Sequence, residues 1–182
     1  DQDHPGFRDA AYRARRNEIA RLALAWRDGD PLPEVPYSDA EHAVWAQICQ
    51  LLIPLHEARI ASPLAMLHRV MVLDRQRIPV FADVNAELAA LTGFRLRPVA
   101  GLVSLRSFLT RLGRRQFVST QYIRHASQPL YTPEPDVVHE LLGHAVSLAH
   151  PVLAFVHRLF GWAAELADDV EIQRLGSVYW YA

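Results

Sequence analysis

This 182-residue sequence has a single cysteine and almost no net charge. Cys49 is the only cysteine, so no disulfide can form within the chain and nothing indicates an oxidising compartment. The formal net charge is −1, which argues against a nucleic-acid partner because phosphate binding needs a basic excess. No apolar run reaches the roughly 20 residues that span a bilayer, and the first six residues lack the layout of a signal peptide. We therefore expect a cytoplasmic protein with no membrane partner.

Hydrophobic spacing predicts helix over most of the chain. Helices are expected at about 7–27, 38–54, 62–73, 83–92, 104–112, from about 136, 151–166 and 170–181. Ser38 and Glu41 have capping-box spacing, Pro54 should end or kink the helix that they open, and Asp83 should cap the next short helix. Two short strands are expected at 94–100 and 116–123, and a loop at 127–135. The expected fold class is α+β, mainly helical with a few short strands, in a single domain spanning 1–182.

The most informative stretch ends in His139-Glu140-Leu-Leu-Gly143-His144. It looks like the zinc-protease signature H-E-x-x-H, but its histidines are five residues apart rather than four. At 100° per residue, five residues turn a straight helix by about 140°, which would splay the two rings. Either a left-handed Gly143 that ends the helix or a π-bulge would bring the imidazoles together.

Two neutral imidazoles brought together in this way could bind one metal ion, with a carboxylate to complete the set. Two histidines and one carboxylate suit ferrous iron, because they leave positions open for oxygen and a cosubstrate. Zinc would prefer a tetrahedral set. A bare pair of histidines at this spacing is more often just two polar residues near a helix end, so the flanking sequence has to decide.

The flanking sequence resembles the pterin-dependent aromatic amino acid hydroxylases, and within them the phenylalanine hydroxylases most. The resemblance is carried by Gln121-Tyr-Ile-Arg124-His125, Tyr131-Thr-Pro-Glu-Pro-Asp136, His139-Glu-Leu-Leu-Gly-His144, Asp3-His4-Pro5-Gly6-Phe7, Tyr12-Arg13-Ala14-Arg15-Arg16 and the segment from Thr92 to Leu102. These blocks keep the family's order over most of the chain, although 57–80 matches poorly. The resemblance implies the family's catalytic-domain fold, with the C-terminal part of that domain missing.

The resemblance also implies a role for each residue of the constellation. His139 and His144 would be the histidine ligands of iron, and Glu140 would be a catalytic residue that contacts the pterin side rather than the metal. Arg124 would hold the substrate carboxylate through its planar fork, oriented by Asp136. The amino acid pocket would be formed by Tyr131, Thr132, Pro135 and Trp180 with support from Tyr179, and the pterin site by Phe108, Gly101, Leu102 and Val103. The alternatives are a surface charge for Arg124, plain core for the aromatic residues and a packed turn at 101–103.

Two positions depart from the family's pattern. Val118 stands where phenylalanine hydroxylases have a histidine near the pterin, and a valine cannot donate a hydrogen bond, so pterin placement or the position of ring attack would differ. The family's glutamate ligand follows a Tyr-Trp-aromatic triplet by three residues. Here the triplet is Tyr179-Trp180-Tyr181, which places the expected third iron ligand two residues after Ala182.

The implied function is that of a monooxygenase that hydroxylates the ring of an aromatic amino acid. Its cofactors would be Fe(II) and tetrahydrobiopterin or a related tetrahydropterin, and its cosubstrate molecular oxygen. Phenylalanine converted to tyrosine is the favoured reaction, while meta attack, or tyrosine or tryptophan as substrate, remains open. The alternatives from other classes are a zinc hydrolase with Glu140 as general base, which the histidine spacing disfavours, and an inactive, metal-poor binding fragment. The sequence does not predict an oligomeric state.

Overall fold

The computed structural model describes residues 5–60, 70–71 and 73–181. The helix expected at 62–73 falls mainly on residues outside this part. Residues 1–4, which include the start of the Asp3–Phe7 block, and Ala182 also lie outside it. No helix in the described parts of the chain combines the length and the apolar character needed to cross a membrane.

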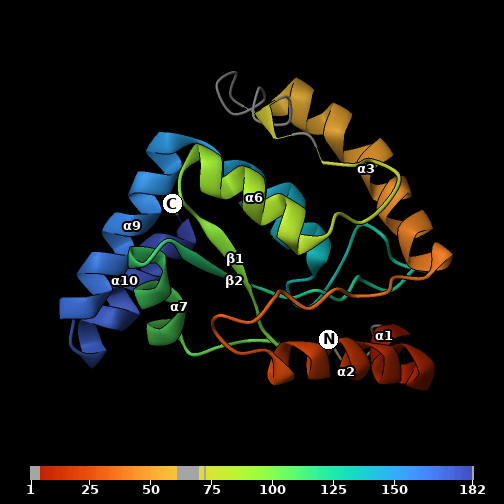
Figure 1. Ribbon diagram of the computed structural model, residues 1–182, viewed down its shortest axis with the longest axis horizontal. Coiled ribbons are helices and arrows are strands. Elements are labelled where there is room, and N and C mark those ends of the chain that lie inside the picture. Colours follow the sequence, from red (N-terminus) through yellow and green to blue (C-terminus); the bar gives the residue numbers. More distant parts are fainter. Residues whose placement is uncertain (1–4, 61–69, 72, 182) are drawn as a thin grey trace.

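Helices surround a small parallel sheet in the described part of the chain (Figure 1). In chain order the elements are α1 (Pro5–Arg8), α2 (Ala10–Ala25), α3 (Asp39–Arg59), α6 (Phe81–Leu91), β1 (Arg95–Pro98), α7 (Leu105–Gly113), β2 (Gln116–Ser119), the π-helix η1 (His139–Ala145), α8 (Val146–Leu148), α9 (Pro151–Leu166) and α10 (Asp169–Tyr181). The strands β1 and β2 pair in parallel, with Arg95 opposite Gln116 and Pro98 opposite Ser119. The mainly helical fold with short strands is confirmed.

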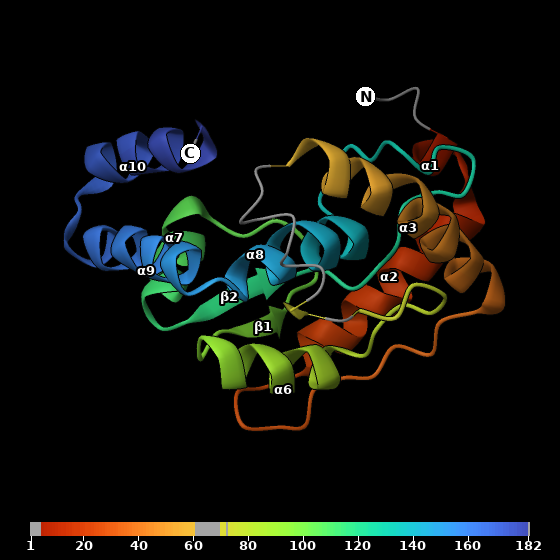
Figure 2. The ribbon, with the colours of Figure 1, turned by 90° about the horizontal axis from the view of Figure 1, so that it is seen from above.

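The helices gather at two ends of the molecule. Figure 2 shows α1, α2 and α3 at one end and α7, α9 and α10 at the other, with the strands and α8 between them. Buried side chains from both ends and from the middle join one core, which includes Trp45 of α3, Phe81 of α6, Phe94, Phe117 of β2 and Leu141 of η1. The core therefore fixes η1 from several sides.

Local sequence signals set most helix ends, with two exceptions. The capping box at Ser38 and Glu41 is confirmed, with bonds of 3.2 Å and 2.7 Å between the side chain of each residue and the backbone N–H of the other. Gly93, at φ 79°, follows the end of α6 as expected. Of the two alternatives for Pro54, an end of the helix is wrong, because α3 continues to Arg59 and its buried face offsets the missing hydrogen bond. The predicted cap at Asp83 is also wrong, since α6 begins two residues earlier and Asp83 lies in its first turn.

The second strand is shorter than the predicted 116–123, and the site explains why. Beyond β2 the backbone N–H of Thr120 donates to the Glu140 carboxylate at 3.2 Å. The backbone N–H of Arg124 donates to the Asp136 carboxylate at 2.8 Å. Side chains of the motif region thus take the hydrogen bonds that a neighbouring strand would otherwise provide.

Helices α7 and α9 touch backbone to backbone at Gly161. A Cβ atom at Gly161 would lie 1.9 Å from the backbone nitrogen of Gly113 and 2.8 Å from the carbonyl carbon of Leu112. Neither atom can move without shifting a helix. We expect Gly161→Ala to lower the free energy of unfolding by about 3 kcal/mol or more, measured by urea denaturation. A change below about 1 kcal/mol would mean that the helices do not meet this closely.

Candidate active site

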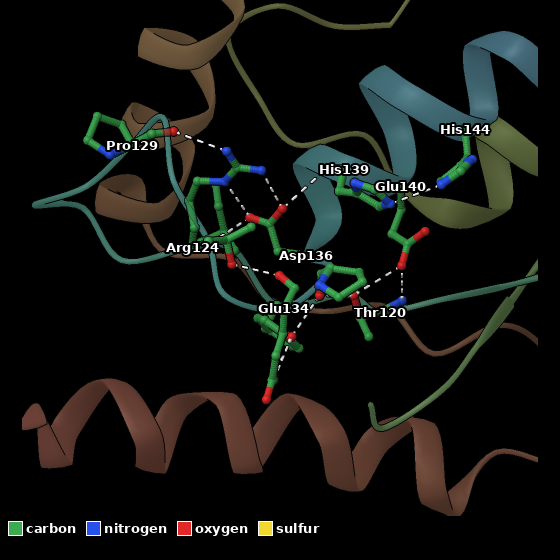
Figure 3. Close-up of polar contacts among 12 residues, drawn as sticks. Thr120, Arg124, Pro129, Glu134, Asp136, His139, Glu140 and His144 are labelled. Carbon is green, nitrogen blue, oxygen red and sulfur yellow. Dashed lines mark hydrogen bonds and ion pairs between the residues drawn. The ribbon is translucent and has the colours of Figure 1, made fainter. Parts of the chain in front are cut away.

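His139 and His144 are brought together by the π-helix η1. Hydrogen bonds in a π-helix join residues five apart, so these two histidines fall on one face. Their Nε2 atoms lie 2.9 Å apart and their ring centroids 4.6 Å apart (Figure 3). The π-bulge alternative is confirmed and the left-handed Gly143 is wrong, because the described glycines with positive φ are Gly29 and Gly93. The sequence could not choose between them, since glycine permits both.

The backbone conformation at position 143 therefore does not require glycine. A Cβ atom at this position would meet nothing within 4 Å. We expect Gly143→Ala to leave the free energy of unfolding unchanged or to raise it by up to about 1 kcal/mol, because alanine favours helix over glycine. Urea denaturation measures this beside Gly161→Ala, which is the same substitution at a crowded glycine. A loss of several kcal/mol at Gly143 would instead support the left-handed turn.

Both imidazoles are held in the neutral form that binds metals. Burial lowers the pKa of His144 to about 3, and the neighbouring His139 and His157 add to that effect. Loss of hydration also lowers the pKa of His139, the more exposed ring of the pair. Neutral imidazole nitrogen is the ligand form, so the lowered pKa values of both rings favour the form that binds a metal.

Glu140 adds a carboxyl group to the pair. It is buried, and one carboxylate oxygen accepts hydrogen bonds from the backbone N–H and the hydroxyl of Thr120 at 3.2 Å and 3.3 Å. Burial raises the pKa of Glu140 to about 8, against these two bonds. A Glu140 oxygen and one ring nitrogen from each of His139 and His144 all lie within 4.8 Å of one another. The carboxyl group of Glu140 therefore lies in the same cluster as the two imidazoles.

Arg124 and Asp136 form a buried ion pair next to η1. Asp136 receives Nε of Arg124 at 2.9 Å and Nη2 at 2.7 Å, and their side chains are 8 % and 0 % exposed. Nη1 of Arg124 reaches the carbonyl oxygen of Pro129 at 3.3 Å. Asp136 also accepts the backbone N–H of His139 at 3.1 Å. One carboxylate therefore fixes the arginine fork and the first turn of the histidine helix (Figure 3).

A cavity of about 710 Å³ lies beside the histidines. Most of its wall is apolar, from side chains such as Leu105, Phe117, Leu153 and Phe160, while His139, Glu140 and His144 provide a polar end. This size and this mixture are typical of a site for a small organic ligand.

The whole chain matches a known protein family. Residues 1–182 match the family described as biopterin-dependent aromatic amino acid hydroxylase. The chain belongs to this family. It is 44 % identical over 185 residues to tyrosine 3-monooxygenase of Homo sapiens, covering 100 % of this chain and 35 % of that protein. It is 42 % identical to phenylalanine-4-hydroxylase of Homo sapiens, again covering 100 % of this chain and 41 % of that protein. The chain thus spans well under half the length of these two relatives.

A solved structure supports the same fold for this hydroxylase-family chain. Phenylalanine hydroxylase of Chromobacterium violaceum, with bound iron(III) and 7,8-dihydrobiopterin, aligns with a TM-score of 0.81 at 30 % identity. The alignment covers 93 % of this chain and 62 % of that one. The expected catalytic-domain fold of the hydroxylase family is confirmed.

The cavity collects many of the residues that the hydroxylase resemblance singled out. Those that line it are Gly101, Leu102, Val103, Phe108, Pro135, His139, Glu140, His144, Tyr179 and Trp180. Phe108 also packs edge-on against Phe117 and Tyr179, with ring centroids 5.5 Å and 5.3 Å away. Val118 lines the same cavity. Trp180 stands at its margin with 84 % of its surface exposed.

Other predicted residues lie outside the cavity wall. Arg124, Asp136, Tyr131 and Thr132 are absent from its lining. Tyr131 is 46 % exposed, and the Thr132 hydroxyl donates to the carbonyl oxygen of Glu134 at 2.7 Å. The predicted amino acid pocket is therefore divided: Pro135, Tyr179 and Trp180 line the cavity, while Tyr131 and Thr132 do not.

Thr120 and His157 are polar cavity residues that had no predicted role. Thr120 holds Glu140, as described above. His157 lines the cavity from α9, and its Nδ1 lies 2.8 Å from the carbonyl oxygen of Leu153. A nitrogen facing a carbonyl must carry the hydrogen, so Nε2 is left as an acceptor. No sequence signal marked His157, because the apolar spacing of its helix is explained by packing alone and gives no reason to single out one histidine.

Proposed function

We propose that this protein is an iron- and tetrahydropterin-dependent monooxygenase that hydroxylates the ring of an aromatic amino acid. Phenylalanine, giving tyrosine, is the substrate that we favour. The observation that carries the proposal is the pair of neutral imidazoles of His139 and His144, aligned by a π-helix at the polar end of the cavity. Family membership supports the same chemistry.

The donor set fits a ferrous ion. His139 and His144 offer two nitrogens that stay unprotonated, with their Nε2 atoms 2.9 Å apart. Imidazole and carboxylate together suit a divalent iron with open positions. The five-residue spacing also argues against the zinc-protease arrangement, whose histidines share a face of an α-helix. When bound, iron and the tetrahydropterin together supply the activated oxygen.

The cavity fits a flat, partly polar ring such as a pterin. Phe108 offers an aromatic surface, and the segment 101–103 can meet a ring edge through backbone groups. At the other end Glu140 is held by Thr120, and its raised pKa, about 8, makes it a hydrogen-bond donor at neutral pH before any cation binds. The apolar wall would keep water away from the reacting groups.

Arg124 would bind the carboxylate of the amino acid. Asp136 occupies the edge of the guanidinium formed by Nε and Nη2. The edge formed by Nη1 and Nη2 is left for a second carboxylate, apart from a long contact of 3.3 Å to the Pro129 carbonyl. Asp136 would act as a positioning residue, because it fixes both this fork and the start of η1. Tyr131, Thr132, Pro135 and Trp180 would complete the amino acid pocket, with Tyr179 supporting it.

The identity of the amino acid is the finer part of the proposal. Relatives with nearly equal identity are named tyrosine 3-monooxygenase and phenylalanine-4-hydroxylase. Val118 gives a reason to examine the position of attack, since it brings no hydrogen-bond donor to the cavity. The test is turnover by the full-length protein with Fe(II), tetrahydrobiopterin and oxygen on phenylalanine, tyrosine and tryptophan separately, with products identified by mass spectrometry and NMR. Absence of a hydroxylated product from all three would sink the proposal.

We further propose that the third iron ligand is a glutamate two residues after Ala182. Anaerobic titration with Fe(II) of the 182-residue chain, and of a chain extended through that glutamate, tests this. The extended chain should bind more tightly, because a carboxylate completes the set. Equal affinity would remove the assignment while leaving the two histidine ligands in place.

A further inference from the structure

Helix α9 carries an exposed apolar stripe that the active site does not use. Its members are Val152, Phe155, Leu159, Trp162 and Leu166, which are 62 %, 48 %, 45 %, 39 % and 91 % exposed. They recur at alternating intervals of three and four residues, the spacing of the seam of a two-stranded coiled coil. None of the five lines the cavity. An apolar patch of this kind on a protein surface marks an interaction site.

The stripe lies on the free side of its helix. The buried residues of α9 are the small ones, Ala154, Gly161 and Ala164, and Gly161 faces the backbone of α7. Figure 2 shows α9 at the end of the molecule away from α1, α2 and α3. The stripe therefore lies mostly on the outer side of α9, and the Trp162 ring also lies beside α7, since a Cβ atom added at Gly113 would be 3.2 Å from its Cδ1 atom.

Charges beside the stripe indicate what would cover it. Arg158 and Glu165 occupy equivalent flanking positions, seven residues apart, on the same side of the seam. If two α9 helices run antiparallel with Leu159 opposite Trp162 of the second copy, Arg158 falls opposite Glu165 of that copy. Two-fold symmetry then repeats the ion pair. A parallel pair would place Arg158 near Ala163 of the other helix, where no charge is available.

Neither charged side chain has a close ion pair of its own among the described residues. The Arg158 guanidinium lies over the Trp162 ring, 4.5 Å from its centroid, and its Nε is buried without a hydrogen-bond partner among the described residues. Glu165 makes one loose contact, 3.5 Å from Nε of Arg114, and that pair is 70 % and 40 % exposed for arginine and glutamate. An exposed pair of this length contributes little and can be shared with a second partner.

We propose that α9 forms an antiparallel two-helix interface with α9 of a second copy of this chain. Covering the stripe would bury roughly 500 Å² on each copy, given that a large aromatic side chain buries about 150–250 Å². This is at the low end for a specific interface. We therefore expect a reversible dimer whose population rises with protein concentration. The interface does not depend on the proposed hydroxylase activity.

Sedimentation velocity over a concentration series tests the interface. The chain should dimerise, and Leu159→Glu should leave a monomer at every concentration, because two carboxylates would enter the seam. Leu51→Glu on α3 is the matched control, since Leu51 is also 45 % exposed, and it should dimerise normally. Circular dichroism confirms that each variant is folded. A wild-type chain that stays monomeric, or a dimer that tolerates Leu159→Glu, would overturn the proposal.

Charge reversal tests the antiparallel register. Arg158→Glu and Glu165→Arg should each weaken the dimer by about tenfold, because each creates two like-charged contacts across the two-fold axis. The double variant should recover most of the wild-type affinity. Failure of that rescue would rule out the pairing of Arg158 with Glu165. The same measurements apply to a longer protein that contains this sequence. If it stays monomeric and its α9 becomes sensitive to protease only after Leu159→Glu, another segment of the same chain covers the stripe. That result would also overturn the proposal.

Discussion

Replacing His144 with alanine should lower the affinity of this chain for Fe(II) by at least about 100-fold, since loss of a residue that merely supports a ligand already costs 10–100-fold. His139→Ala should have the same effect, because the two Nε2 atoms, 2.9 Å apart, face one position. Hydroxylation should be lost together with the metal. Anaerobic titration calorimetry measures the affinity, and product formation is followed in parallel.

The control for both histidine variants is His56→Ala on α3. His56 is absent from the cavity lining, so its removal should leave iron binding unchanged. Fe(II) affinity that survives His144→Ala would contradict the metal site itself. Iron binding that is lost without any loss of hydroxylation would contradict the proposed reaction instead.

Asp136→Asn should lower the free energy of unfolding by about 3–5 kcal/mol, because it leaves the buried Arg124 charge without its partner. For a chain of this size, the melting temperature should fall by about 10 °C. The asparagine also loses one of the oxygens that receive Arg124 and the start of η1. Differential scanning calorimetry of the variant gives the result directly.

Asp169→Asn provides the exposed counterpart of that substitution. Asp169 pairs with Arg106 at 2.9 Å, but its side chain is fully exposed at 101 %. Solvent screens such a pair, so no measurable change in melting temperature is expected. If Asp136→Asn matched this control, Asp136 would not be what holds the arginine fork in place.

Much of the fold follows from local sequence signals. The capping box of Ser38 and Glu41, the Gly93 stop and the apolar spacing of α9 each act within a few residues, so they can be read from the chain. Pro54 shows the limit of such signals, because the packing of α3 on the core outweighs the bond that proline removes. The length of β2 also could not be predicted, since it depends on the carboxylates of Asp136 and Glu140, which come from a later segment of the chain.

The candidate site divides in the same way. The motif residues lie within one short stretch, 121–144, so the pairs His139 with His144 and Arg124 with Asp136 could be named from the sequence and are adjacent in space. The choice between a left-handed glycine and a π-helix depended on backbone hydrogen bonding that no side chain reveals. His157 lines the cavity because α9 packs on α7 and α8, which spacing within a helix cannot indicate.

The π-helix also bears on how such a site can change. A π turn holds one residue more than an α turn, so η1 is equivalent to an α-helix with a single residue inserted between the two histidines. Removing Leu141 or Leu142 would return the histidines to the four-residue interval that zinc hydrolases use. One codon therefore separates the histidine spacing of an iron site from that of a zinc site.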